Sequence, residues 1–165
     1  MTQHTYTLDL LWTGNRGTGT SGYRAYSRNH DLTAPGAGVI AGSADPAFRG
    51  DPARWNPEQL LLASVAQCHM LWYLHLASVA GVVVTGYADH PEGVMVEESN
   101  GAGQFSEVTL NPVVRVATAE QVERARELHG RVGEVCFIAR SVNFPIRHRV
   151  TVEVGGGEAH RAESP

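Results

Sequence analysis

The most hydrophobic part of the chain, residues 60–80, predicts a long central helix. Asn56 is a good N-cap, Pro57 fits the first helical position, and Gln59 completes a capping box. Gly81 predicts the end of the helix. Apolar side chains occupy nearly every side of this helix, so it cannot be a surface helix and must be enclosed by protein. At ~1.5 Å per residue it is roughly 36 Å long, more than one small chain readily covers.

Three strands and several irregular segments are predicted ahead of this helix. Residues 5–12 alternate between apolar and polar, which is typical of a half-buried strand. The glycine-rich residues 13–22 lack a phosphate-loop motif and predict a turn. Residues 23–30 predict a second strand, and residues 39–40 a short further one. The irregular residues 42–55 are either the wall or lid of a site or a plain connector.

The second half of the chain predicts an antiparallel meander and a second helix. Strands are expected at residues 82–89, 94–98 and 104–117, the last one bent at Asn111-Pro112. A helix then opens at Thr118 as its cap. Its narrow apolar stripe suits packing on a sheet or on the central helix, and it contains Val122, Ala125, Leu128 or His129, Val132, and Val135 or Cys136.

A last strand, residues 146–154, completes the order of strands, long helix, strands, helix and strand. This order predicts an α+β fold in which antiparallel sheets enclose helices. The length of 165 residues favours a single domain over residues 1–154. The polar residues 155–165 predict a disordered tail.

Charge and composition narrow the classes of function. The net charge of −4 is modest and the acidic residues are scattered, so no nucleic-acid partner is expected. No basic and apolar leader precedes the first strand, and polar residues interrupt the longest apolar run, residues 71–84, so neither a signal peptide nor a membrane span is expected. A cytoplasmic location is therefore predicted, where two cysteines are usually reduced, and often simply buried.

Metal and serine chemistry fit the sequence poorly. Cys68 and His69 are adjacent and point about 100° apart on a helix, and His69 and His75 also diverge. No CxxC, HExxH or G-x-S-x-G motif is present, so no metal site and no nucleophile-elbow hydrolase is expected. Thiol chemistry remains. A cysteine in mid-helix such as Cys68 needs a neighbouring cation to favour its thiolate, and an arginine held by a carboxylate would serve.

Two segments carry a resemblance to a known family over residues 4–154. Asn56-Pro57-Glu58-Gln59-Leu60 leading to Cys68, and Cys136 within Gly133-Glu134-Val135-Cys136-Phe137-Ile138, resemble the OsmC/Ohr family of thiol-dependent organic hydroperoxide reductases. The resemblance implies an OsmC-like fold, with antiparallel sheets wrapped around long central helices in an intertwined homodimer. It implies that Cys68 is the peroxidatic cysteine, Cys136 the resolving cysteine and Glu58 the family's glutamate.

The resemblance also implies a reaction. The Cys68 thiolate would reduce an organic hydroperoxide and become a sulfenic acid, Cys136 would condense with it to a disulfide, and an external dithiol would reduce that disulfide. No cofactor or metal is implied. Met70, Leu71 and Trp72 either bind an alkyl or fatty-acid hydroperoxide or are simply core residues. The other class of function compatible with the sequence is a small-molecule binding protein that keeps the pocket without peroxidase activity.

Two features depart from the family pattern. The family places its catalytic arginine in more than one segment, so Arg28, Arg16 and Arg49 are all candidates, and Arg28 is favoured because a strand would hold it firmly. Phe137 stands where a proline is usual. His69 is expected to form a structural hydrogen bond or to move a proton.

The spacing of Glu58 and Cys68 gives an independent argument for a dimer. Residues ten apart (68 − 58) on one helix are separated by ~15 Å along its axis, so Glu58 is poorly placed to act on Cys68 of its own chain. Two antiparallel copies of the helix that cross near Ala63 would bring Glu58 of each chain beside Cys68 of the other. The predicted partners are thus a second copy, an organic hydroperoxide and a dithiol.

Overall fold

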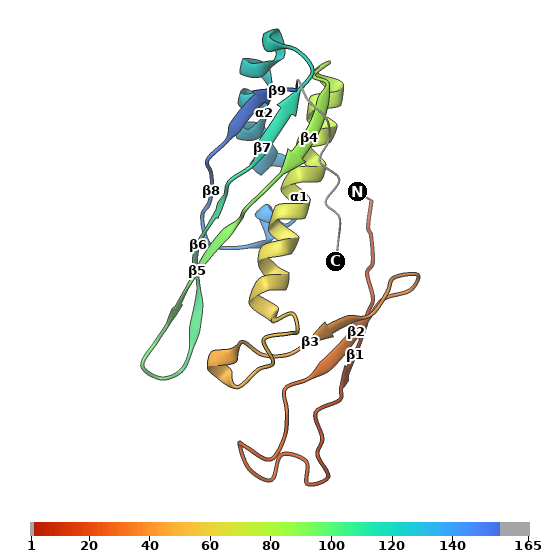
Figure 1. The fold of residues 1–165 in the computed structure, drawn as a ribbon, viewed down its shortest axis with the longest axis vertical. Coiled ribbons are helices and arrows are strands. Elements are labelled where there is room, and N and C mark those ends of the chain that lie inside the picture. The colour runs from red at the N-terminus through yellow and green to blue at the C-terminus, as the bar shows by residue number, and fades with distance from the viewer. Residues whose placement is uncertain (1, 156–165) are drawn as a thin grey trace. The chain divides into compact units, whose positions relative to one another are not determined.

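The computed structural model describes residues 2–155, in two compact units that divide between Leu61 and Leu62. The central helix α1, Pro57–Val79, begins in the first unit and continues into the second. Strands and helices together make the predicted α+β fold (Figure 1). Residues 156–165 of the predicted tail lie outside the described residues.

The N-terminal unit contains a three-stranded antiparallel sheet in the order β1-β2-β3. Its strands are β1 (Asp9–Trp12), β2 (His30–Thr33) and β3 (Ile40–Gly42). β1 is shorter than the predicted residues 5–12, and all four of its residues are exposed rather than half-buried. The connector before α1 is irregular apart from one 3-10 turn, Pro46–Phe48, as predicted.

The predicted strand over residues 23–30 is wrong. Both terminal nitrogens of Arg28 donate hydrogen bonds to backbone carbonyls, one to Tyr26 and one to Tyr23, each at 2.9 Å. Its guanidinium also lies 4.4 Å and 4.3 Å from the ring centroids of these tyrosines. These contacts require the segment to fold back on itself. In an extended strand, Tyr23 would be too far from Arg28 for its carbonyl and its ring to reach the guanidinium. Arg28 therefore lies in a folded loop and not in a strand.

The start of α1 forms as the sequence predicts. The Asn56 side chain accepts a hydrogen bond from the Gln59 N–H at 2.7 Å, and the Gln59 side chain accepts one from the Asn56 N–H at 3.1 Å. This reciprocal pair is a capping box. At the other end, Gly81 has a φ of 72°, a left-handed conformation that glycine adopts without strain, and it follows the last helical turn.

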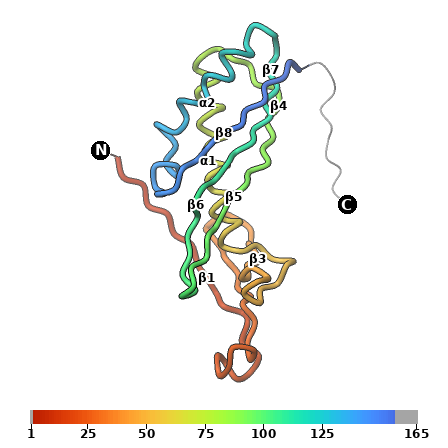
Figure 2. Tube along the Cα trace, turned by 90° about the vertical axis from the view of Figure 1, so that its left-hand side faces the viewer, coloured from red at the N-terminus to blue at the C-terminus, as the bar shows by residue number. Residues whose placement is uncertain are grey.

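The C-terminal unit contains two three-stranded sheets, in the orders β4-β7-β9 and β5-β6-β8, and the helix α2. Figure 2 shows β5 and β6 side by side along their length. The predicted bend at Asn111-Pro112 separates β6 from β7. The C-terminal segment forms two strands instead of one, and each pairs in parallel with its neighbour, unlike the predicted meander. The elements of this unit after α1 are β4 (Val84–Ala88), β5 (Glu92–Glu97), β6 (Gly103–Leu110), β7 (Val113–Val116), α2 (Val122–Val135), β8 (Ile146–His148) and β9 (Thr151–Val154).

The helix α2 buries the predicted stripe. Ala125, Leu128, His129 and Val132 are its buried residues. Its predicted cap is wrong, because Thr118 makes no side-chain cap bond and a 3-10 turn, Ala119–Gln121, leads into the helix.

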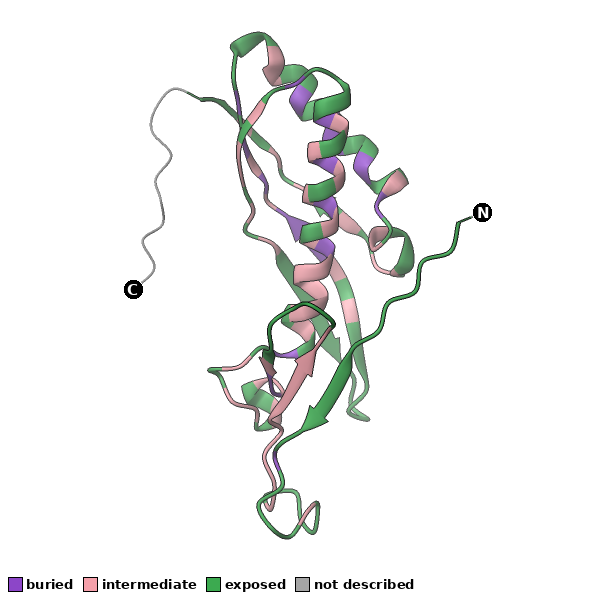
Figure 3. Ribbon diagram, turned by 90° about the vertical axis from the view of Figure 1, so that its right-hand side faces the viewer, coloured by how far each residue is buried: buried purple, intermediate pink, exposed green. Residues whose placement is uncertain are grey.

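The core of the C-terminal unit covers only one stripe of α1. Val65, His69, Tyr73 and Ala77 are the buried residues of this helix and recur every fourth position, so they share one face (Figure 3). Against them pack residues of β7 and α2, among them Val114 and Leu128. Large apolar side chains elsewhere on the helix stay accessible, including Leu71 at 61% exposed. The expected enclosure on all sides is therefore not provided by the chain itself.

The capping box should contribute measurably to stability. Replacing Asn56 by Ala removes the side-chain acceptor for the Gln59 N–H and should lower the free energy of unfolding by about 1–2 kcal/mol. Thr118→Ala is the matched control, since Thr118 makes no cap bond, and its effect should stay within about 0.5 kcal/mol. Urea unfolding at one fixed protein concentration measures both, and equal effects would contradict the assignment.

Candidate functional site

The two cysteines meet in the C-terminal unit although they lie far apart in the sequence. Cys68 is half-buried on α1, and Cys136 is buried directly after the last residue of α2. Both are free thiols, and Cys68 packs against the buried core cluster that contains Cys136. Burial, and after it the neighbouring Cys68 thiol, raise the pKa of Cys136 to about 11. Cys136 is therefore a protonated thiol at neutral pH, next to Cys68.

An apolar recess lies on the same face of α1 as Cys68. Leu71, Trp72 and His75 line a hollow of about 240 Å³. These residues follow Cys68 by three, four and seven positions, the spacing of one helix face. Trp72 also makes an edge-to-face contact with Phe137, at 5.5 Å between ring centroids. Two of the three predicted substrate residues, Leu71 and Trp72, thus line this recess, while Met70 does not.

Glu58 and the three candidate arginines belong to the N-terminal unit. Glu58 lies in the first turn of α1, and its Oε2 is buried with no hydrogen-bond partner in the part of the chain that the structure describes. No ion pair between Glu58 and an arginine is present among residues 2–155. The guanidinium of Arg28 is engaged by its own loop, and that of Arg49 lies 5.9 Å from the ring centroid of Tyr23.

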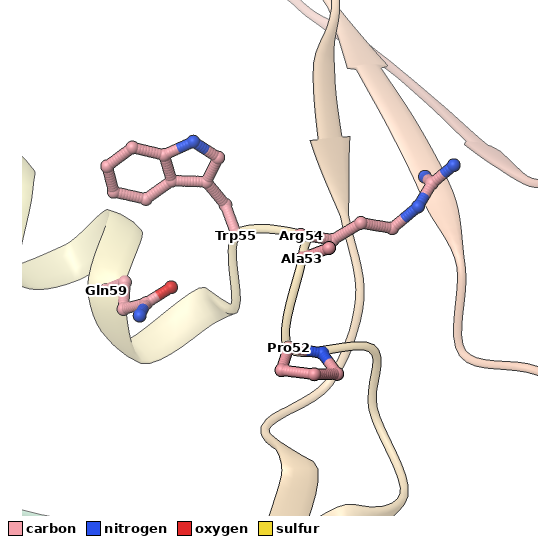
Figure 4. A pocket seen from close by; sticks show the side chains of 5 residues that line it. All are labelled: Pro52, Ala53, Arg54, Trp55 and Gln59. Carbon is pink, nitrogen blue, oxygen red and sulfur yellow. The ribbon is translucent and has the colours of Figure 1, made fainter. Parts of the chain in front are cut away.

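A second recess, of about 230 Å³, lies beside the start of α1 and is drawn in Figure 4. Trp55 and Gln59 are on one side of it, and the guanidinium of Arg54 is directed away from both. Arg54 forms an ion pair with Asp31 at 3.1 Å and approaches Asp51 at 3.9 Å. Its charge is therefore matched by Asp31 of β2 and by Asp51 of the connector, and this recess presents no free cation to a ligand.

Three histidines form a cluster next to the thiols that the sequence did not predict. His69 Nε2 and His129 Nδ1 share a hydrogen bond of 2.9 Å. The ring of His148 lies 4.5 Å from that of His69, and the ring of Tyr73 stacks on His129 at 3.9 Å. His69 and His129 are 3% and 2% exposed. The structural hydrogen bond anticipated for His69 is present.

Burial keeps these histidines neutral. Desolvation, with smaller contributions from the nearby His148 and His129, lowers the pKa of His69 to about 3. Desolvation, with a smaller contribution from His148, lowers the pKa of His129 to about 4. The pKa of His148 is also lowered by burial. Within residues 2–155 no group of three His, Cys, Asp or Glu residues has a geometry suited to a metal ion.

One sequence signal pointed to this cluster. His129 lies on the apolar stripe of α2. His148, Val150 and Val152 occupy every second position of the C-terminal segment, as residues on one face of a strand do. A histidine at an apolar position predicts a buried imidazole that needs a polar partner. Periodicity cannot tell which distant residue supplies that partner, so the cluster was missed.

Comparison with known protein families matches residues 50–153 to the family described as OsmC-like protein. No curated protein matches the chain. Among solved structures, an OsmC-like protein of unknown function from Vibrio cholerae O1 is 25% identical, with 90% of this chain and 99% of that chain covered and a TM-score of 0.80.

Two further solved structures bear names that state a role. An organic hydroperoxide resistance protein from Elizabethkingia anophelis is 18% identical, with 93% of this chain and 100% of that chain covered and a TM-score of 0.64. The organic hydroperoxide resistance protein OhrB of Bacillus subtilis is 17% identical, with 91% and 98% covered and a TM-score of 0.59. At these identities the likeness establishes a shared fold.

The buried histidines should make stability fall in mild acid. The unfolded chain takes up protons near pH 6.5, whereas His69 and His129 in the folded state do so only near pH 3 and pH 4. The unfolded state therefore binds more protons across this window, and the free energy of unfolding decreases as the pH drops from about 6.5 to about 4. Urea unfolding at a series of pH values measures the slope.

Two variants show whether the cluster causes that slope. His129→Asn removes one titrating group and should make the decrease shallower, whereas His4→Gln changes an exposed histidine outside the cluster and should leave it unaltered. A stability that is constant between pH 7 and pH 4.5, or an equal change in both variants, would contradict the neutral buried cluster.

Proposed function

The chain belongs to the OsmC-like protein family, and from that premise we propose that it is a thiol-dependent peroxidase that reduces organic hydroperoxides. The observation that carries the proposal is the pair of neighbouring free thiols, Cys68 and Cys136, beside an apolar recess. The names of the Elizabethkingia anophelis and Bacillus subtilis proteins support the same class of substrate.

The environments of the two thiols suit different roles. Cys68 is half-buried and so partly open to solvent, and it shares a helix face with the residues that line the recess. Cys136 is 1% exposed and its pKa is raised, so it stays protonated and out of reach of the peroxide. The thiolate is the nucleophile in such chemistry. We therefore assign the attack to Cys68 and the resolution to Cys136.

The proposed first step transfers one oxygen atom. The Cys68 sulfur attacks the terminal oxygen of the hydroperoxide, the O–O bond breaks, and the alkoxide takes the proton that Cys68 gave up. The products are an alcohol and the Cys68 sulfenic acid. In the second step the Cys136 sulfur displaces hydroxide from that sulfenic acid, and the thiol proton converts the hydroxide to water. A dithiol then supplies two electrons and two protons to the disulfide.

The recess favours a hydroperoxide with an apolar substituent. Leu71 and Trp72 give it an apolar lining, and the 68% exposed Phe137 packs edge-to-face on Trp72. Burial of an alkyl or aryl group against such a surface gains about 25 cal/mol per Å². Hydrogen peroxide has no such group, so we propose alkyl, aryl or fatty-acid hydroperoxides as substrates. Met70 stays a predicted substrate residue without a contact to this recess.

We further propose that two copies of the chain assemble through α1. The helix is apolar on nearly every side, yet its own chain buries one stripe of it. It is also long and apolar enough to cross a membrane, but the core helices of soluble proteins pass the same test. Polar side chains such as Gln67 and Ser78 on its accessible sides suit a protein partner better than lipid. The expected setting is the cytoplasm.

The second copy would also complete the site. The unpartnered Oε2 of Glu58 calls for a hydrogen-bond donor. An arginine held by this carboxylate would favour the Cys68 thiolate, and antiparallel packing of two α1 helices would bring Glu58 of one chain to Cys68 of the other. Arg28, Arg16 and Arg49 remain the candidates for that arginine.

Removal of the attacking sulfur should abolish turnover. Cys68→Ser should consume cumene hydroperoxide, with dihydrolipoate as reductant, at least a thousandfold more slowly than wild type, because a serine hydroxyl stays protonated and is a far weaker nucleophile. Cys136→Ser should react once and stop at the sulfenic acid, which dimedone traps. No turnover by the wild type would instead favour a binding protein of the same fold.

Mixing two inactive variants tests whether Glu58 acts across chains. In a two-fold dimer of a Glu58→Gln chain and a Cys68→Ser chain, one site has both an intact Cys68 and an intact Glu58, so co-expression should restore about a quarter of wild-type activity. If Glu58 acts on its own chain, the mixture stays as inactive as its components. Sedimentation velocity confirms that the mixed species is a dimer.

A further inference from the structure

We propose that the hydrogen bond between His69 and His129, with His148 packed against it, is a positioning device that holds α1 and α2 in the register required for the Cys68–Cys136 disulfide. The proposal deepens the peroxidase cycle and rests on it. These histidines are positioning residues, because they act on the two sulfurs through the helices that carry them.

The hydrogen bond between His69 and His129 lies close to both thiols along the two helices. His69 is the residue after Cys68 on α1. His129 is seven residues before Cys136 (136 − 129), about two turns of α2 and therefore on the same face. The bond of 2.9 Å thus links the two helices directly beside one sulfur and two turns from the other. A shift of either helix along or about its axis would break it.

Close packing does not fix Cys136 on its inner side. Cys136, His69 and His148 line one enclosed cavity of about 50 Å³ together with apolar residues of β6 and β8. Atoms that face a void lose contacts on that side and are held less firmly. The cavity therefore leaves room for the chain around Cys136 to shift, since Gly133 and Ala139 on either side of it also line the cavity. A directional bond between the helices opposes that movement where packing does not.

Stability alone gives no reason for histidines at these positions. A buried polar ring costs free energy unless its polar atoms are paired, and His129 Nε2 has no partner among the described residues. Apolar side chains of similar size would avoid that cost. What they lack is a hydrogen bond with a fixed direction, which specifies one arrangement of the helices. A buried polar pair can fulfil this role in other helical proteins.

The neutral state of the cluster keeps the device intact at physiological pH. The groups that face the bond are Tyr73 on α1, His148 on β8 and the two thiols. None of them brings a carboxylate to the cluster that would favour an imidazolium. A single proton shared between two neutral imidazoles satisfies the pair, whereas two imidazolium rings would repel each other at this distance.

The reaction step that depends on this device is disulfide formation. Two cysteines bridge only when their Cα atoms lie about 4.4–6.8 Å apart with suitable side-chain directions. Holding the reacting groups in such a geometry raises their effective concentration and speeds the displacement of hydroxide from the sulfenic acid. Loss of the device should therefore weaken and slow formation of the disulfide without removing either sulfur.

A matched pair of variants at His129 tests the proposal. Asn and Leu have nearly the same shape, but only Asn offers a polar group where His129 Nδ1 bonds His69. His129→Leu should lower the effective concentration of the two thiols at least tenfold, which raises the reduction potential of the disulfide by about 30 mV. His129→Asn should retain most of the wild-type potential. Equilibration with dithiothreitol buffers measures these values without any peroxide.

Trapping of the sulfenic acid compares the rate of disulfide formation in the same variants. After one equivalent of cumene hydroperoxide, dimedone should trap several times more Cys68 sulfenic acid in His129→Leu than in wild type or His129→Asn. If His129→Leu does not fold, His69→Met and His69→Gln form an equivalent pair, because the Gln amide reaches the place of His69 Nε2.

The outcomes separate the two proposals. Equal potentials in wild type and in both variants, or an equal shift in the polar and apolar variants, would overturn the positioning role. A wild type that forms no sulfenic acid would overturn the peroxidase while leaving the potentials to decide the role of the histidines.

Discussion

The structure depends on one constraint: α1 is apolar on nearly every side, and a single chain covers one stripe of it. Val65, His69, Tyr73 and Ala77 define that stripe, and the sheets and α2 of the C-terminal unit pack on it. Cys68 lies beside this stripe and is half-buried. It can therefore pack against the core cluster that contains the buried Cys136 and still remain partly exposed.

The sequence correctly predicts those features of the fold that depend only on neighbouring residues. The capping box of Asn56 and Gln59, the stop at Gly81 and the bend at Asn111-Pro112 all depend on neighbouring residues, and they occur where the sequence places them. The segment around Arg28 is different. Its composition resembles a strand, but two tyrosine rings and two carbonyls bind the guanidinium and fold the chain around it.

Features that join distant segments were predicted less completely. The pairing of Cys68 with Cys136 followed from the family resemblance and not from spacing, and the parallel pairing of β8 and β9 was not predicted. The histidine cluster joins three elements, and its members are recognisable in the sequence only as histidines at apolar positions. Each of these contacts depends on tertiary packing, which periodicity along one segment does not encode.

The thiols and the histidines together explain why polar groups occupy the interior between α1 and α2. The thiols provide the proposed chemistry, and the hydrogen-bonded imidazoles fix how the two helices meet. The intact mass of the reduced protein after one equivalent of an organic hydroperoxide tests the peroxidase most directly. Wild type should lose two hydrogen atoms as the disulfide forms, and Cys136→Ser should gain one oxygen atom. An unchanged mass in both proteins would contradict the account.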